Sequence, residues 1–245
     1  MFLIGLIFVS SQLVGESHGD WRVRPSSRFS QSFSKPRDSL SWESELAIRV
    51  LNKNEVRAFS NFERRKFSGG RKLNDMQIGA GSLLFLHPRL YLDLAGAYTP
   101  QVDFLPRYEM KAEPHFTWSS FDFSLGSRWR SYSKVKTFSL KSAISWELSE
   151  FFRLASFLDT SLKPERTLSG GMSANFTWAQ ALETRLSLAG GRSDEGDGIF
   201  DDFTEIRLSF LFPILSELRL GLDGGFRASE LRDELSYGAT LLGRF

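Results

Sequence analysis

The sequence contains no cysteine and only three histidines among its 245 residues. The lack of cysteine excludes disulfide bridges, thiolate metal ligands and a cysteine nucleophile. The scarcity of histidine leaves few general bases for acid–base catalysis. After the first 15 residues, no stretch approaches the roughly 18 consecutive apolar residues that a spanning helix needs. If the mature chain crosses a membrane, it must therefore cross it as β-strands.

The chain also has no large excess of charge of either sign. The chain has 31 Lys and Arg against 29 Asp and Glu, which gives a net charge of +2, and the two signs are interspersed. No polybasic stripe of the kind that nucleic-acid binders carry is present. With 41% hydrophobic residues the chain is not disordered, and its length fits one large domain.

The first residues resemble a secretory leader. Residues 1–14 read MFLIGLIFVSSQLV, and the small residues Ser17 and Gly19 fit a signal-peptidase site. This pattern predicts a signal peptide over residues 1–19, a short periplasmic segment over 20–26 and a barrel domain over 27–245. The alternative for the leader is a buried N-terminal strand, because no basic residue precedes its apolar core.

From about residue 27 onward, apolar and polar residues alternate with a period of two. In residues 89–99, for example, Leu90, Leu92 and Leu94 share one face, while Arg89 and Asp93 lie on the other. The pattern predicts an all-β, transmembrane antiparallel up-and-down β-barrel of about 14 strands, with 12 as the alternative. A soluble β-sandwich is disfavoured because its strands average five or six residues. The strands are expected at 27–34, 40–51, 55–67, 73–86, 89–99, 106–118, 121–132, 136–148, 151–163, 166–179, 182–192, 203–212, 215–227 and 233–245.

Aromatic residues support a membrane setting for these strands. Tryptophans on the apolar parity fall near predicted strand ends, where an aromatic girdle meets the lipid headgroups. The last strand ends in a terminal aromatic on the apolar face, which resembles the assembly signal of outer-membrane proteins. The predicted interface aromatics are Trp42, Tyr98, Trp118, Trp129, Trp146, Trp178 and Tyr237, and the predicted assembly signal is Tyr237, Leu241 and Phe245.

Four segments resemble one family, the YaiO-type outer-membrane β-barrels. They are RFSQSFSKPRDSLSW at 28–42, AYTPQVDFLPRY at 97–108, GSRWRSY at 126–132 and LSGGMSANFTW at 168–178. The family's usual Gly-Tyr-Ser-Pro is Ala97-Tyr98-Thr99-Pro100 in this chain. The resemblance implies a barrel in the outer membrane of a Gram-negative bacterium. It implies no catalytic residue, because the family has no settled activity.

The polar face of the strands carries charges of both signs and is expected to line the lumen. Two interpretations remain open. One is a water-filled pore or an export or assembly component for small or saccharide solutes, and the other is a closed lumen filled by cross-strand salt bridges. The predicted lumen-lining residues are Glu45, Arg49, Arg107, Glu109, Lys111, Glu113, Asp122, Arg128, Arg130, Lys141, Arg153, Asp159, Arg185, Glu205, Arg207, Arg219, Asp223 and Arg227.

A barrel enzyme acting on lipid or peptide is the third interpretation. Past the leader its only histidines are His87, in a predicted turn, and His115, beside Glu113. A structural role for His115 is favoured, and a site built from carboxylates alone is the remaining alternative. We therefore expect no catalytic residue and no cofactor. The acidic loop 193–202 does not have EF-hand spacing, so no metal site is expected either. The expected partners are outer-membrane lipid, lipopolysaccharide and the barrel-assembly machinery, with the chain as a monomer that binds no nucleic acid. Pro114 should cause a bulge or an early strand end.

Overall fold

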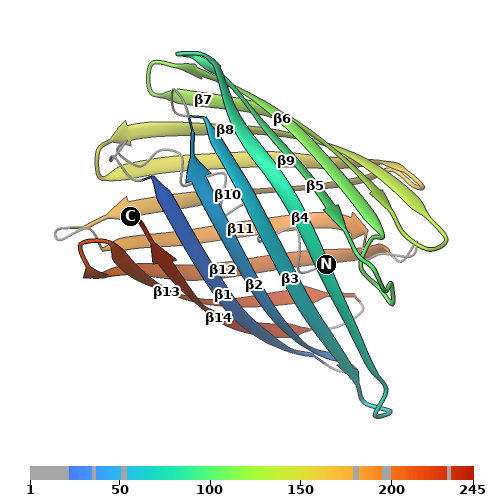
Figure 1. The fold of residues 1–245 in the computed structure, drawn as a ribbon. Coiled ribbons are helices and arrows are strands. Elements are labelled where there is room, and N and C mark those ends of the chain that lie inside the picture. The colour runs from blue at the N-terminus through green and yellow to red at the C-terminus, as the bar shows by residue number, and fades with distance from the viewer. Residues whose placement is uncertain (1–21, 35–36, 51–53, 179–181, 195–199, 231–232) are drawn as a thin grey trace.

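The computed structural model describes residues 22–34, 37–50, 54–178, 182–194, 200–230 and 233–245. The predicted signal peptide over 1–19 lies outside these residues. The described part folds as strands joined by turns and loops (Figure 1). Among the described residues, no helix is long and apolar enough to cross a membrane.

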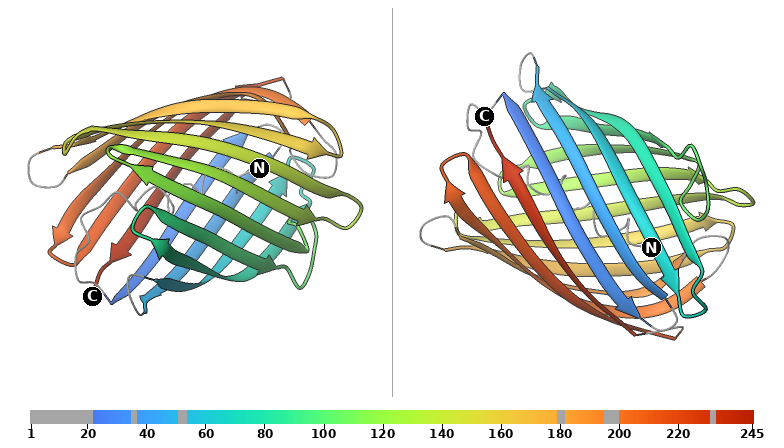
Figure 2. Two further views of the ribbon diagram at one scale, coloured as in Figure 1. Left: turned by 90° about the horizontal axis from the view of Figure 1, so that it is seen from above. Right: turned by 60° about the horizontal axis from the view of Figure 1, so that its bottom comes forward.

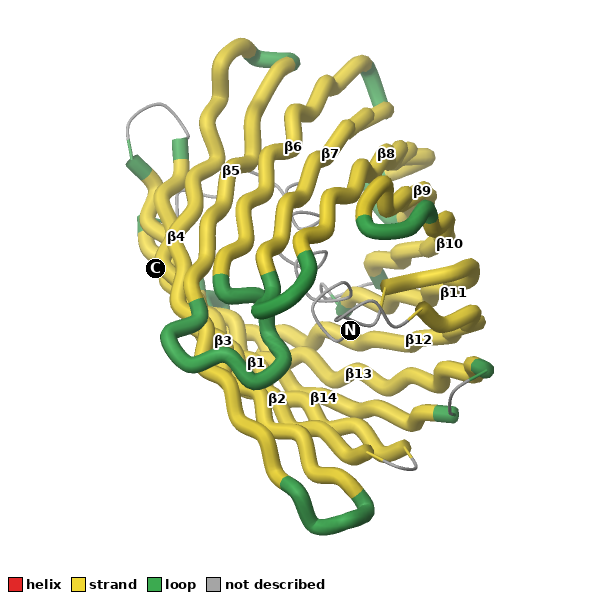
Figure 3. Tube along the Cα trace, turned by 90° about the vertical axis from the view of Figure 1, so that its right-hand side faces the viewer, coloured by secondary structure: helices red, strands yellow, loops and turns green. Residues whose placement is uncertain are grey.

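Fourteen antiparallel strands close into one barrel, which confirms the predicted fold class. Each strand pairs with its neighbours in the sequence, and the first strand pairs with the last (Figures 1 and 3). The strands are β1 (Val23–Ser34), β2 (Arg37–Arg49), β3 (Glu55–Phe67), β4 (Lys72–His87), β5 (Leu90–Tyr98), β6 (Tyr108–Trp118), β7 (Phe121–Ser131), β8 (Lys136–Ser149), β9 (Phe152–Lys163), β10 (Thr167–Thr177), β11 (Glu183–Asp194), β12 (Phe200–Leu215), β13 (Leu218–Ser229) and β14 (Glu234–Gly243).

The two ends of the described chain meet where the barrel closes. The backbone N–H of Val23 donates to the carbonyl of Phe245 at 2.7 Å, and the N–H of Phe245 donates to the carbonyl of Val23 at 2.8 Å. Figure 2 shows the end of β14 beside the start of β1. Residues 23–26 thus belong to β1 and not to the periplasmic segment expected over 20–26. Pro25 obscured this strand start in the sequence, yet it continues the ladder opposite Leu46.

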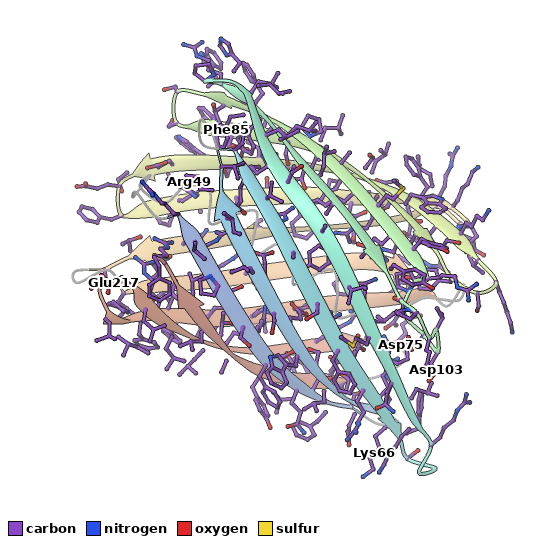
Figure 4. All side chains as sticks on the ribbon, viewed as in Figure 1. Arg49, Lys66, Asp75, Phe85, Asp103 and Glu217 are labelled. Carbon is purple, nitrogen blue, oxygen red and sulfur yellow. The ribbon has the colours of Figure 1, made fainter. Side chains whose placement is uncertain are left out.

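The barrel has two different ends. At the turn end, residues 88–89, 119–120, 150–151 and 216–217 join strands directly, and Val23 and Phe245 also lie there. At the loop end, residues 68–71, 99–107 and 132–135 form longer connections. Figure 4 shows Arg49, Phe85 and Glu217 towards the turn end, and Lys66, Asp75 and Asp103 towards the loop end.

The distribution of polar and apolar side chains on the strands is the reverse of that in a soluble protein. In β6 the charged residues Glu109, Lys111 and Glu113 are buried, whereas Met110 and Phe116 are exposed on the outer surface. Buried side chains across the barrel are mostly polar or charged, and large apolar side chains of most strands are exposed. Only a surrounding apolar medium makes this arrangement favourable, because exposing so many large apolar groups to water is costly. The outer surface is therefore the lipid-facing surface.

Pro114 does not end β6 or produce a bulge, so that prediction was wrong. Pairing of β6 with β7 stops after Ala112–Ser127 and resumes at His115–Ser124 in the same register. The missing N–H of proline therefore opens a short gap in the ladder without shifting it. Gly126 fills the opposite side of this gap, and its Cα lies under the Glu113 side chain, where a Cβ would come 3.4 Å from Glu113 Cγ.

Candidate functional site

The barrel encloses one large cavity of about 1100 Å³. Every one of the fourteen strands contributes residues to its wall. The cavity reaches the turn end, where Pro88, Ser120 and Phe151 line it. At the loop end the wall stops at Asn61 on β3 and Gln77 on β4, but on β14 it reaches Glu234, the first residue of that strand. The lumen is therefore not completely filled by side chains, and it is the candidate functional site.

A dense ionic cluster covers the wall formed by β3, β5 and β6. The Asp93 carboxylate lies between two cations: it accepts from the Arg57 guanidinium and, at 3.0 Å, from Lys111 Nζ. Lys111 Nζ also lies 2.8 Å from Glu113 Oε2. Asp93 is 1% exposed, so its charge is stabilised by these two partners instead of by water. This cluster ties three strands together.

His115 lies beside this cluster and contacts two carboxylates. Its Nδ1 is 3.0 Å from Asp122 Oδ1, and its Nε2 is 3.5 Å from Glu113 Oε1. Its ring stacks on Tyr91 with centroids 4.3 Å apart, and the Tyr91 hydroxyl donates to Asp122 Oδ2 at 2.7 Å. Ser124 donates its hydroxyl to Glu113 Oε1 at 2.8 Å. The imidazole is thus held between carboxylates, and the hydroxyl of Ser124, opposite it in the β6–β7 register, donates to Glu113, which favours a structural role for His115.

A second group of ion pairs crosses the closure of the barrel. Asp223 on β13 accepts from Arg28 Nη2 on β1 at 2.9 and 3.0 Å, and from Arg207 Nη1 on β12 at 3.3 Å. Asp223 on β13 thereby links β1, which lies beyond β14, to β12 on its other side. Further along, Arg219 Nη1 lies 2.6 Å from Glu183 Oε1. Paired charges of this kind hold the lumen wall in register and leave it polar.

A third cluster lies on β6 and β7 near the loop end. Glu109 is shared by two arginines, with Arg128 Nε 3.5 Å and Arg130 Nε 3.7 Å from its carboxylate oxygens. Both guanidinium side chains are largely buried. Two positive charges therefore face one buried negative charge at this level of the lumen.

The loop 99–107 folds inward at the loop end. Asp75 on β4 accepts backbone hydrogen bonds from Asp103, Phe104 and Leu105 at 2.8, 2.8 and 2.6 Å. The guanidinium of Arg65 lies 3.8 Å from the centre of the Phe104 ring. Asp75 and Leu105 are buried, and Figure 4 shows Asp75 and Asp103 together at this end. We call residues 99–107 the inner loop, because it covers the inner face of β3 and β4.

Most of the residues predicted to line the lumen are on the cavity wall. Of the other five, Arg128 and Arg130 bind Glu109, and Asp159 lies opposite Lys141 in the β8–β9 register. Arg49 lies at the turn end of β2, and Arg107 is exposed in the inner loop because β6 begins one residue later. The cavity-lining members are Glu45, Glu109, Lys111, Glu113, Asp122, Lys141, Arg153, Arg185, Glu205, Arg207, Arg219, Asp223 and Arg227.

Several charged residues inside the barrel are missing from the set predicted from the sequence. Arg57, Glu63 and Arg65 on β3 are buried inside the barrel, and so is Asp75 on β4. The strand 55–67 was expected, and its odd positions carry these three charges, so the period-two pattern could have found them. No pattern in the sequence indicated that Asp75 would bind the backbone of a loop 28 residues further along.

The predicted interface aromatics lie on the outer surface. Trp118 ends β6, and Trp178 directly follows β10. Trp42 lies deeper than expected because β2 begins at Arg37 and not at residue 40. Trp129 is half-buried, whereas Trp42, Tyr98, Trp118, Trp146, Trp178 and Tyr237 are exposed, as are the predicted assembly residues Leu241 and Phe245.

A closed antiparallel barrel with an apolar outer surface and a charged lumen defines an outer-membrane β-barrel protein. The chain belongs to the YaiO membrane β-barrel family: the model of the YaiO membrane beta barrel domain matches residues 26–197. This match confirms the family resemblance of the four sequence segments. No curated protein matches the chain.

Several solved structures share this fold. A TodX deletion mutant, described as a monoaromatic hydrocarbon channel, has a TM-score of 0.69 at 6% identity and covers 93% of this chain and 91% of its own. The translocator domain of the autotransporter NalP from Neisseria meningitidis has a TM-score of 0.56 at 10% identity, covering 99% and 95%. OccK3 (OpdO) of Pseudomonas aeruginosa has 0.53 at 9%, covering 92% and 96%. At these identities the likeness shows the fold alone.

Proposed function

We propose that the barrel is a non-enzymatic channel that lets small polar or saccharide-like solutes pass the outer membrane of a Gram-negative bacterium. The observation that carries this proposal is the cavity of about 1100 Å³, which is bounded by all fourteen strands. A lumen closed by salt bridges would leave no such space, and the volume is at the upper end of small-molecule binding sites, about 300–1,000 Å³.

The chemistry of the wall supports polar cargo. Most of its charges are held in pairs such as Arg219 with Glu183 and Arg153 with Glu147, so they present hydrogen-bond donors and acceptors without a large net field. Aromatic side chains, among them Tyr91 and Phe152, also line the cavity. Hydroxyl-rich solutes can exchange their water for such groups at little cost.

The inner loop sets the width of the entrance. In the orientation usual for these barrels, the turn end faces the periplasm and the loop end faces the exterior. The cavity then opens to the periplasm, and the inner loop narrows the outer mouth on the side of β3 and β4. Small solutes are therefore expected to pass more readily than long chains.

The surroundings of the barrel follow from its surface. We propose that the lipid-facing strands are inserted by the outer-membrane assembly machinery, which reads the exposed terminal Phe245, and that the chain acts as a monomer. Lipopolysaccharide would contact the outer loops, where Arg71, Lys134 and Lys136 provide cations. We do not assign lipid or peptide hydrolysis to His115, because both of its ring nitrogens face carboxylates.

A liposome-swelling assay tests the channel. Liposomes that contain the refolded protein should swell in isotonic arabinose or glucose, and progressively more slowly in disaccharides and trisaccharides. The control is the same protein boiled before reconstitution. Absence of swelling with every sugar, from a barrel that still shows a heat-dependent gel mobility, would overturn the proposal in favour of a closed structural barrel.

A further inference from the structure

Arg185 on β11 stands out among the cations that line the cavity. Eight of the others form ion pairs within 4 Å in the described part of the barrel, such as Arg219 with Glu183 and Arg153 with Glu147. Lys141 lies over the Phe157 ring, and Arg244 also has a partner. Arg185 makes no hydrogen bond or ion pair with any described residue.

The residues directly across from Arg185 are uncharged. In the barrel register Arg185 lies opposite Asn175 on β10 and opposite Ser209 on β12. All three side chains line the cavity, and neither Asn175 nor Ser209 has a side-chain partner in the described structure. The row therefore offers a guanidinium, an amide and a hydroxyl, all able to donate hydrogen bonds, with no acidic residue among them.

The charged groups around this row do not neutralise Arg185, because each has another partner. Arg153, opposite Asn175, pairs with Glu147, and Asp223, opposite Ser209, is bound by Arg28 and Arg207. Glu183, two residues away on the same face of β11, is bound by Arg219 at 2.6 Å. Arg207, across from the neighbouring Ser187, carries the same sign as Arg185 and is occupied by Glu205 and Asp223. A positive charge with vacant donors consequently faces the lumen from this side of the barrel.

From this arrangement we propose that Asn175, Arg185 and Ser209 form a binding subsite for the oxyanion of a small solute, the carboxylate of a sugar acid or a phosphate group. The planar guanidinium fork matches two oxygens of such a group, and the amide and hydroxyl extend the set of donors. The subsite rests on the proposed channel function and specifies it: among small polar solutes, the lumen would retain those that carry a negative charge.

Calorimetric titration of the refolded full-length barrel in detergent, at low ionic strength, tests the subsite. Sodium glucuronate is expected to give a saturable heat, and glucose, its uncharged counterpart, none. Arg185→Gln should weaken glucuronate binding about tenfold or more, because a charge-assisted bidentate contact is lost. The matched control is Arg153→Gln, which removes the same charge from β9, on the other side of Asn175, but from a guanidinium already held by Glu147. It should change the affinity by about twofold at most.

A second variant protects the test against a folding defect in Arg185→Gln. Asn175→Asp places a carboxylate opposite Arg185, so it should satisfy the guanidinium from within the protein, abolish glucuronate binding and leave the heat-dependent gel mobility intact. Inorganic phosphate separates the two possible sources of the ligand. If phosphate competes with glucuronate, the subsite recognises oxyanions in general, and if it does not, the subsite is selective for the carboxylate.

Two results would overturn the subsite: equal affinity in wild type, Arg185→Gln and Asn175→Asp, or no heat from either anion. The measurement needs no solute flux. A barrel that binds glucuronate at Arg185 but passes no sugar would therefore refute the channel and support the subsite. A barrel that passes sugars without binding either anion would support the channel and refute the subsite.

Discussion

The carboxylate of Asp75 accepts the backbone N–H of Leu105 at 2.6 Å, and this contact connects the barrel wall to the inner loop. Two further N–H groups, those of Asp103 and Phe104, donate to the same carboxylate. One buried side chain thus satisfies three consecutive backbone donors that the loop could not satisfy within itself. The position of the inner loop in the mouth therefore depends on Asp75.

Replacing Asp75 should release the inner loop. Asp75→Ala removes three charge-assisted hydrogen bonds, each worth about 1.5–3 kcal/mol, and leaves the loop free to leave the wall. Arg107 is exposed in this loop, so trypsin should cleave after it faster in the variant than in wild type. The measurement is limited proteolysis of the refolded barrel with identification of the cleavage site.

Asp103→Asn is the matched control for that experiment. Asp103 is exposed and contributes its backbone N–H to Asp75, so changing its side chain should leave the rate of cleavage unchanged. Equal cleavage after Arg107 in Asp75→Ala and in wild type would show that the loop is held by other contacts.

The ionic cluster around Asp93 should be a major source of stability. Asp93→Asn leaves the buried Arg57 guanidinium without its anion, and removing one partner of a buried pair costs about 3–5 kcal/mol. Urea unfolding of the refolded barrel, followed by tryptophan fluorescence, measures this change. Glu147→Gln breaks the more exposed pair with Arg153 and should cost less than about 1 kcal/mol. A similar loss in the two variants would contradict the buried cluster.

A new charge should destabilise the barrel much more on the outer face of the wall than on the inner face. Leu125 lies in the middle of β7 on the outer surface, so Leu125→Arg should destabilise the barrel in lipid by about 2–4 kcal/mol. Ser145 on the adjacent β8 lines the cavity, and Ser145→Arg should cost less than about 1 kcal/mol because the new charge is hydrated. Folding equilibria in lipid vesicles measure both, and a reversed order would invert the assignment of the faces.

The terminal phenylalanine should matter for insertion more than for stability. The Phe245 side chain is exposed, while its backbone closes the barrel against Val23. Phe245→Ala keeps the backbone contacts, so the refolded variant should unfold at the urea concentration of wild type. In cells, its amount in the outer-membrane fraction should fall. An unchanged amount would argue against an assembly signal at this residue, and Leu235→Ala, on the same face of β14, is the control.

Much of the fold could be predicted from the sequence because each strand has to separate lipid from water. That requirement imposes the period of two, and it placed β3, for instance, at its observed bounds of 55–67. The contacts that shape the site depend on long-range geometry. The inner loop, the Asp93 cluster and the unpaired state of Arg185 follow from register and loop conformation, which alternation does not encode.

The most direct test of the whole account is the single-channel conductance of the refolded protein in a planar bilayer, after boiling has been shown to shift its gel mobility. The wild-type barrel should give stable conductance steps. These steps should become larger or more frequent in Asp75→Ala, because the inner loop then no longer narrows the mouth. A silent bilayer from a correctly folded barrel, in both wild type and Asp75→Ala, would contradict the account.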